Sequence, residues 1–328
     1  MSNNKFRTGL KKLVNDKVAI AFILLVIIFI IGELIVPGFI AFSHIMTVLQ
    51  ASCFLGPIAL GQTMVLISGK EGLDLSVGAT LTVGVLLGAA LADGKNINLP
   101  LAIIVVLVVG FILGLVNGIG ISFLGIAPLI MTLAWGIVIE GALLFISKGS
   151  YPGKASPILE TLGNGSLQIN IFSHLMRIPW AVVIWIIIIL VAMFVLKRTT
   201  IGYILYGVGA NDRAAGLLGI KTRIVRMLAY GFSGMLATLS GILLLGYVSD
   251  PNINMGARYV FPSIVAVVIG GVSFGGGYGS YIGAVIGSIF LTTLTSILVT
   301  LGLNEGGRQI ITGVVLVILL LIYTRRKR

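Results

Sequence analysis

The chain has 328 residues, of which 58% are hydrophobic and 10% are charged, whereas soluble domains carry about 25% charged residues. This composition argues against a water-soluble fold. The 44 glycines and 9 prolines show no Gly-X-Y period, which excludes collagen, and they fit membrane helices, whose backbones approach closely at small residues. The single cysteine, Cys53, excludes an intramolecular disulfide framework and a multi-cysteine metal site.

A helix needs about 20 mostly apolar residues to cross the hydrocarbon layer. Stretches near that length, separated by polar or Gly/Pro residues, predict an all-α polytopic membrane protein with about ten transmembrane helices. The predicted spans are Val18–Val36, Ile45–Ile67, Leu73–Ala92, Leu99–Phe123, Pro128–Ser147, Ile178–Leu196, Met227–Val248, Tyr259–Val272, Tyr278–Leu301 and Gln309–Tyr323.

The basic residues indicate the orientation of these spans, because Lys and Arg are retained on the cytoplasmic side. With a cytoplasmic N-terminus and ten spans, 16 of the 22 Lys and Arg residues lie inside and 6 outside. Both termini are then cytoplasmic. The net charge of +12 is thereby explained by topology, so we expect the lipid bilayer and no nucleic acid as a partner. The first apolar run has no small-residue cleavage pattern before Pro37, so we expect it to be a retained span.

We expect one transmembrane domain, residues 1–328, with no soluble domain. It has a cytoplasmic N-terminal segment (1–17), a cytoplasmic loop (197–226) and a basic cytoplasmic tail (324–328). Ten spans divide into two five-helix halves, which an odd number of spans per half would place in opposite orientation as an inverted repeat. Glycine-rich helix openings at 72–84 and 271–287 echo such a repeat, although chance resemblance stays open.

Glycines at every fourth position put small residues on one helix face, as at Gly110, Gly114 and Gly118. We interpret this face as a close helix contact rather than as a pore lining. Signals for other chemistry are missing. The sequence has no Walker A pattern and no G-x-G-x-x-G, and its two histidines, His44 and His174, are far apart. We expect no enzyme activity, metal or cofactor on this chain, so any ATP-driven motor is another polypeptide.

A polar, glycine-rich interruption at 69–78 contains Asp74 and Ser76. Irregular backbone at membrane depth is tolerated where it is buried in protein or lines a cavity, so this segment is a candidate part of a solute path or gate. An ordinary cytoplasmic turn, with Asp74 capping the next helix, is the alternative.

Glu140 lies well inside the fifth predicted span, where an acid is costly and usually faces the bundle interior. Other predicted spans contain the uncharged polar and aromatic residues Gln50, Gln62, Asn117 and Trp135. Amide groups and ring faces of this kind typically hold hydroxylated solutes. Helix packing uses the same residue types. The candidate translocation path is therefore Asp74, Ser76, Asn117, Trp135 and Glu140.

The cytoplasmic loop contains a short amphipathic segment that is suited to docking in another protein's groove. Asn211 or Asp212 begins a helix and Gly219 ends it. The residues of this candidate docking segment are Asn211, Asp212, Arg213, Ala214, Ala215, Leu217, Leu218 and Gly219, of which Ala214, Ala215, Leu217 and Leu218 form an apolar face.

Three motifs in order carry a family resemblance: Gly72-Leu-Asp-Leu-Ser-Val-Gly78, Gly209-Ala-Asn-Asp-Arg-Ala-Ala-Gly-Leu-Leu-Gly-Ile220 and Ile269-Gly-Gly-Val-Ser-Phe-Gly-Gly-Gly-Tyr-Gly279. With their spacing, the chain resembles ribose-type ABC transporter permeases along nearly its whole length. One departure is the charged pair Lys70-Glu71, where the family usually has Ser or Gly followed by Gly.

The resemblance implies the membrane subunit of a bacterial importer for a sugar or sugar-like solute, located in the cytoplasmic (inner) membrane. It implies a dimer with a second copy or a sister permease, two cytoplasmic ATP-binding subunits that carry ATP and Mg, and an extracytoplasmic binding protein. The segment from Asn211 to Ile220 would be the coupling helix. A proton-coupled secondary transporter is the alternative, although several intramembrane acids or histidines would then be expected. A membrane scaffold is a third reading, which the interrupted spans disfavour.

Overall fold

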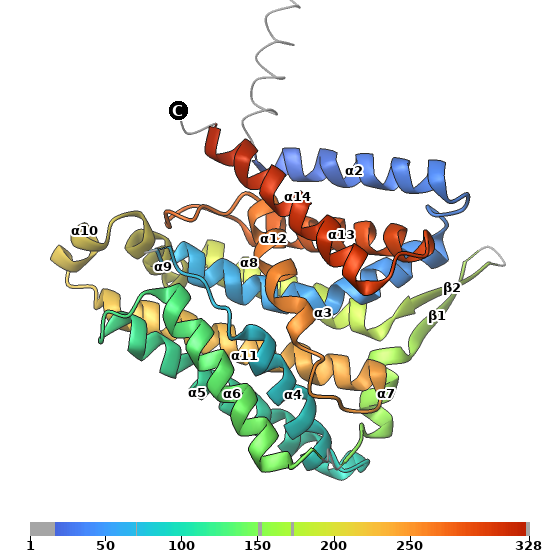
Figure 1. Ribbon diagram of the computed structural model, residues 1–328, viewed down its shortest axis with the longest axis horizontal. Helices are drawn as coiled ribbons and strands as arrows, with labels where there is room; N and C mark the ends of the chain where they lie inside the picture. Colours follow the sequence, from blue (N-terminus) through green and yellow to red (C-terminus); the bar gives the residue numbers. More distant parts are fainter. Residues whose placement is uncertain (1–16, 70, 150–152, 172–173, 326–328) are drawn as a thin grey trace, which may run out of the picture.

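The computed structural model describes residues 17–69, 71–149, 153–171 and 174–325. The first part of the chain folds as five helices with a short 3-10 turn, η1, between the third and fourth (Figure 1). These elements are α2 (Lys17–Ile35), α3 (Phe42–Ile67), α4 (Val77–Ala92), η1 (Asn96–Asn98), α5 (Leu99–Ser122) and α6 (Pro128–Ser147). Most of the N-terminal segment and the residues 326–328 of the tail lie outside the described residues.

A short amphipathic helix and a two-stranded hairpin precede the second part of the chain, which again is helical. The remaining elements are α7 (Pro157–Asn164), β1 (Ser166–Ile171), β2 (His174–Pro179), α8 (Trp180–Arg198), α9 (Thr200–Ala210), α10 (Asp212–Leu217), α11 (Thr222–Val248), η2 (Ala257–Tyr259), α12 (Val260–Ile269), α13 (Tyr281–Thr300) and α14 (Glu305–Arg325).

The all-α, polytopic prediction is confirmed. In the described part of the chain, seven helices are long and apolar enough to cross a membrane: α2, α3, α5, α6, α8, α11 and α13. Each predicted span contains a helix, but α4 has only 16 residues and α12 only 10. The predicted count of about ten spans is therefore not confirmed.

Several predicted boundaries differ from the helix ends, and two of these differences have a clear physical reason. The third span begins at Val77 rather than Leu73, because the polar break continues as turns to Ser76. The segment between the predicted spans Pro128–Ser147 and Ile178–Leu196 contains α7 and an antiparallel hairpin in which Leu167 pairs with Ile178. Polar and apolar residues alternate along β1, which is the period of a β-strand. Ile178, the predicted first residue of the sixth span, belongs to β2 instead.

Helix α11 is the centre of the molecule and packs against α5, α4 and α3. Its largest contact, with α5, is made possible by the glycine face of that helix. A Cβ atom at Gly110 would lie 2.2 Å from Thr238 Oγ1, one at Gly114 would lie 2.0 Å from the Tyr230 carbonyl oxygen, and one at Gly118 would lie 2.6 Å from Met227 Cα. The predicted face of small residues thus serves close helix packing.

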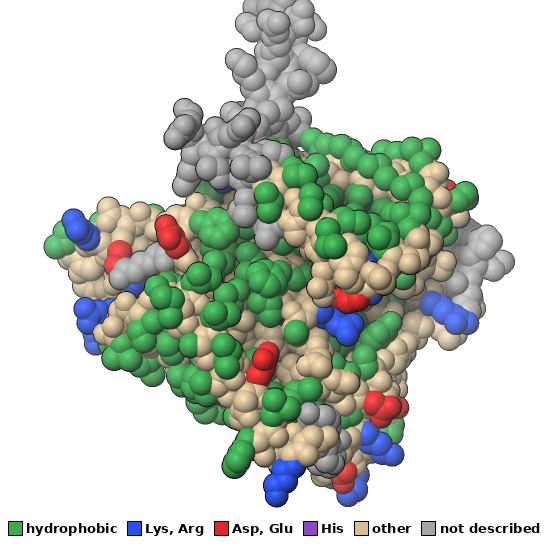
Figure 2. All heavy atoms as spheres, in the orientation of Figure 1, with side chains coloured by type: hydrophobic (Ala, Val, Ile, Leu, Met, Phe, Trp, Pro, Cys, Tyr) green, Lys and Arg blue, Asp and Glu red, His purple; other side chains and the backbone are tan. Residues whose placement is uncertain are grey.

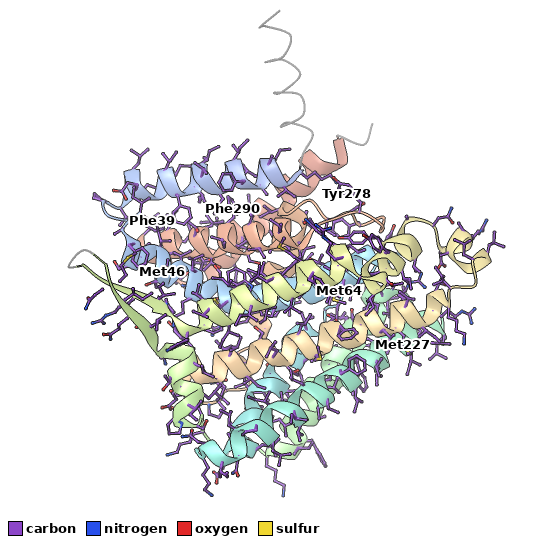
Figure 3. The ribbon with its side chains drawn as sticks, turned by 180° about the vertical axis from the view of Figure 1, so that it is seen from behind. Phe39, Met46, Met64, Met227, Tyr278 and Phe290 are labelled. Carbon is purple, nitrogen blue, oxygen red and sulfur yellow. The ribbon has the colours of Figure 1, made fainter. Side chains whose placement is uncertain are left out.

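The long helices run between two distinct ends of the molecule. Helices α9 and α10 lie at one end and the β1–β2 hairpin at the other (Figure 1). Met227 and Tyr278 lie toward the α10 end, whereas Phe39 and Met46 lie toward the hairpin (Figure 3). Figure 2 shows apolar side chains over much of the surface between these ends. An apolar surface between two ends is expected of a membrane protein whose middle part faces lipid.

Candidate functional site

The polar break between α3 and α4 is buried, and Asp74 is its centre. The Asp74 carboxylate accepts hydrogen bonds from the Ser76 backbone N–H (3.1 Å) and hydroxyl (2.6 Å), and from the Ser233 hydroxyl (2.8 Å). The bond to the N–H two residues on is that of an Asx turn. Ser76, not Asp74, is the residue that precedes α4, so the expected helix cap by Asp74 is not formed.

Three other helices contribute polar groups to this break. Asn117 Nδ2 on α5 donates to Ser76 Oγ at 2.7 Å and lies 3.4 Å from Asp74 Oδ1. Gln62 on α3 binds both backbone groups of Asp74, donating to its carbonyl at 2.7 Å and accepting from its N–H at 3.2 Å. Ser263 on α12 lies 3.4 Å from the same amide nitrogen of Gln62. We call Gln62, Asp74, Ser76, Asn117 and Ser233 the Asp74 cluster.

All five residues of the Asp74 cluster are buried. Among the described residues the carboxylate is held by neutral donors, and Asn117 Oδ1 has no hydrogen-bond partner. The structure therefore brings together Asp74, Ser76 and Asn117, three of the five predicted path residues. In this conformation, however, the cluster fixes an irregular backbone in the protein interior and is closed to solvent.

Trp135 and Glu140 lie on α6 and do not join this cluster. Trp135 Nε1 donates to the Leu113 carbonyl oxygen at 3.0 Å. Gly136 packs next to the break, since a Cβ atom there would lie 3.4 Å from Ser76 Cα. Glu140 follows one turn later and is exposed. Gln50, the remaining polar candidate, donates to the Gly163 carbonyl oxygen at 2.7 Å and ties α3 to α7.

The candidate docking segment folds as α10 and is capped at both ends. Of Asn211 and Asp212, the two residues expected to begin this helix, Asn211 is the N-cap. Its side-chain oxygen accepts a hydrogen bond from the Ala214 N–H at 3.0 Å, as an N-cap residue does. Gly219 has a φ of +80°. The Gly219 N–H binds the Gly216 carbonyl and the Ile220 N–H binds the Ala215 carbonyl, which is the Schellman arrangement.

The free face of α10 differs in one residue from the predicted face. Leu217 is 90% exposed and Leu218 is 82% exposed, and Ala214 is exposed beside them. Ala215 is buried against the rest of the chain, because a six-residue helix lying on a protein surface turns one of its faces inward. Two strongly exposed leucines on a rigidly capped helix are suited to contact another protein.

Arg226, which the sequence indicated only as a cytoplasmic charge, is buried on α11. Its side chain is 2% exposed and its Nη2 lies 3.1 Å from Asp212 Oδ1 of α10. One turn further along α11, the Tyr230 hydroxyl donates to the Leu73 carbonyl oxygen at 3.3 Å. Arg226, Tyr230 and Ser233 were missed as site residues. Arg226 carries no sequence signal that separates it from its basic neighbours Lys221 and Arg223.

The backbone next to α10 also meets two other segments without intervening side chains. The Gly277 N–H donates to the Ile67 carbonyl oxygen at 2.9 Å. A Cβ atom at Gly209 would lie 1.7 Å from that same oxygen, and one at Gly276 would lie 2.5 Å from Gly69 Cα. We call these four glycines, Gly69, Gly209, Gly276 and Gly277, the glycine junction. It joins the end of α3, the end of α9 and the loop after α12.

The described residues contain no group of three or more His, Cys, Asp or Glu side chains that could hold a metal ion. The fold and this site define a multi-pass membrane protein with a buried polar break inside and a capped docking helix at one end.

Comparison with known proteins places this membrane protein in a family. Residues 44–323 match the family model described as branched-chain amino acid transport system / permease component. The fructose import permease protein FruF of Bifidobacterium longum is 31% identical, covering 94% of this chain and 88% of that protein. The autoinducer 2 import system permease protein LsrC of Salmonella typhimurium is 29% identical over 94% of this chain and 85% of LsrC.

The ribose import permease protein RbsC of Haemophilus influenzae is 29% identical over 92% of this chain and 91% of RbsC. No solved structure matches the chain. The chain belongs to the ribose-type family of ABC transporter permeases, and the predicted resemblance is confirmed. It is a multi-pass inner-membrane protein and, at the level of the family, a transport component of an ABC importer.

Proposed function

We propose that this chain is the membrane-spanning permease subunit of an ATP-driven importer, and that it translocates a sugar or sugar-like solute delivered by an extracytoplasmic binding protein. Relatives named for fructose, ribose and autoinducer 2 import support the solute class. The observation that carries the proposal is α10, whose capped helix presents Leu217 and Leu218 outward. Such a surface supports a stable contact with an ATP-binding subunit.

The complete importer would hold a second permease copy or a sister permease, two ATP-binding subunits that carry ATP and Mg, and the binding protein. Both termini of this chain would be cytoplasmic. Helix α10 and the hairpin lie at opposite ends of the molecule (Figure 1), which gives the two kinds of partner separate docking ends. The ATPases would then bind at the α10 end and the binding protein at the hairpin end.

The membrane domain would contain ten spans in two inverted halves, α2–α6 and α8 with α11–α14. Reciprocal packing supports this arrangement. Helix α3 of the first half packs against α12 and α13, while α11 of the second half packs against α4 and α5. In each half the shortest span, α4 or α12, follows an irregular segment, as in transporters built from repeats with broken helices.

The solute path would run along the exposed face of α6, between this chain and the second permease. An acid in a membrane helix usually faces a protein interior or a water-filled cavity, because lipid solvates it poorly. Glu140 is exposed in the single chain, so the second permease would complete its surroundings. Trp135 would contribute a ring face to the solute. Asp74, Ser76 and Asn117 would hold the break that lies behind α6.

Reconstitution into liposomes tests the proposal. The purified chain alone should neither bind ATP nor accumulate radiolabelled D-ribose or D-fructose, whereas the chain with its ATPase and binding protein should accumulate one of these probes when ATP is inside. Among the described residues, no observation favours the proton-coupled alternative. Uphill uptake by the isolated chain in a proton gradient would contradict the importer.

A further inference from the structure

The ion pair between Asp212 and Arg226 connects the docking helix α10 with the central helix α11. The two oppositely charged atoms are 3.1 Å apart, and the Arg226 side chain is 2% exposed whereas that of Asp212 is 37% exposed. A guanidinium is rarely buried without full pairing, because desolvation of the charge is costly. Here Nε and Nη1 are buried without a hydrogen-bond partner among the described residues. A surface position would have satisfied this arginine better, so its burial calls for a role.

Arg226, Tyr230 and Ser233 are spaced i, i+4 and i+7, so they lie along one face of α11. The first contacts α10 through Asp212, the second binds the Leu73 carbonyl, and the third binds the Asp74 carboxylate. With a rise of about 1.5 Å per residue, these contacts span about 10 Å of helix. One helix face therefore joins the docking helix to the polar break.

Helix α11 packs closely against α5 along the stretch that carries Met227 and Tyr230. At Gly114 and Gly118 the backbones of the two helices meet with no side chain between them, and packed interiors are close to incompressible. A movement of α10 that reaches Arg226 is thereby carried to Tyr230 and Ser233.

We propose that Arg226 is a positioning residue that passes displacement of the docking helix α10 through α11 to the Asp74 cluster. This inference rests on the proposed function, since it requires an ATPase bound to α10. It assigns to one buried arginine the coupling between nucleotide state and the conformation of the break.

The test measures how accessible the break is in two nucleotide states of the assembled permease–ATPase complex. The reporter is Leu75→Cys, at a half-buried position in the break, in a Cys53→Ala background without other thiols on this chain. Labelling by a maleimide is timed without nucleotide and after trapping with ATP and vanadate. In the otherwise unsubstituted complex we expect the two rates to differ at least about fivefold, the lower end of usual coupling between sites.

Arg226→Met should bring the ratio of the two rates to about one while the ATPase stays bound, since the methionine keeps apolar bulk but loses the ion pair. Arg226→Lys should retain part of the ratio, because an ammonium can still pair with Asp212. The matched control is Arg223→Met on the exposed side of the same helix, which should keep the full ratio. If Arg226→Met does not assemble, Asp212→Ala removes the pair from its more exposed side and should give the same loss.

A full ratio in Arg226→Met, or in Asp212→Ala where that variant replaces it, would overturn the inference, as would an equal loss in Arg223→Met. A ratio of one in the unsubstituted complex would also overturn it, because the break would then not respond to nucleotide. Failure of the unsubstituted chain to hold any ATPase is a different result. It would refute the proposed function itself.

Discussion

Replacement of Asp74 by Ala should destabilise the permease strongly, because three close donors lose their acceptor. These donors are the Ser76 N–H, the Ser76 hydroxyl and the Ser233 hydroxyl, at 3.1, 2.6 and 2.8 Å. A buried donor left unsatisfied costs about 1–3 kcal/mol. Removal of a buried charge returns several kcal/mol of desolvation, so we expect a net loss of about 3 kcal/mol in the free energy of unfolding.

Asp74→Asn separates the charge from the hydrogen bonds. The amide retains one acceptor oxygen, and its NH₂ group can donate to the Ser233 hydroxyl, so we expect a loss of only about 1 kcal/mol. Asp250→Ala is the matched control, because Asp250 is exposed and surface substitutions usually change stability by less than about 0.5 kcal/mol.

The buried thiol of Cys53 provides the assay. A maleimide dye that fluoresces on reaction reports unfolding of the detergent-solubilised permease as this thiol becomes exposed. Asp74→Ala should have the lowest unfolding midpoint and Asp74→Asn an intermediate one. Asp250→Ala should have the same, highest midpoint as the unsubstituted chain. Equal midpoints for Asp74→Ala and Asp250→Ala would refute the assignment of the cluster as the support of the break.

Other substitutions test separate parts of the structure. Gly114→Ala places a Cβ atom 2.0 Å from a backbone oxygen of α11 and should lower the free energy of unfolding by about 1–3 kcal/mol. At Gly141 an added Cβ atom meets open space, so Gly141→Ala should leave the unfolding midpoint in the thiol assay unchanged or slightly higher. Equal midpoints for the two variants would contradict the packing argument. Leu218→Glu should abolish retention of the ATPase in a pull-down without lowering the unfolding midpoint, and unchanged retention would mean that α10 is only a linker. Asn211→Ala removes a cap of about 1 kcal/mol and should weaken ATPase retention measurably less than Leu218→Glu. Glu140→Leu should reduce uptake of the probe solute more than it reduces assembly, and normal uptake would remove Glu140 from the path.

Features with a local signal could be predicted from the sequence. Asn211 and Gly219 have side-chain and backbone preferences that fix the ends of a helix wherever it lies, and both ends of α10 are where those preferences place them. The glycines of α5 likewise lie at the spacing of a helix contact. Long apolar runs indicated the helices, although the short α4 and α12 show that length alone does not establish a span.

Features that depend on which helix face is buried could not be predicted. Membrane helices are apolar on all sides, so their periodicity does not separate an interior face from a lipid-facing one. The sequence pattern therefore did not distinguish which of the two acids, Asp74 or Glu140, is buried. In the structure Asp74 is buried in a hydrogen-bond network and Glu140 is exposed. Arg226 was assigned to the cytoplasmic loop just before the predicted seventh span, so its burial against α10 was not expected. Ser233 acquires its role only through a partner 159 residues away.

The glycine junction has a consequence for how the α10 end of the molecule can move. Side chains at an ordinary contact can change rotamers, so such a contact adapts by many small steps. Gly69, Gly209, Gly276 and Gly277 have no rotamers, and a Cβ atom at Gly209, Gly276 or Gly277 would come within 2.5 Å of another segment's backbone. Three chain segments there either fit together or separate as whole backbones. We therefore expect the junction to act as a switch with two positions, and intermediate positions should be sparsely populated.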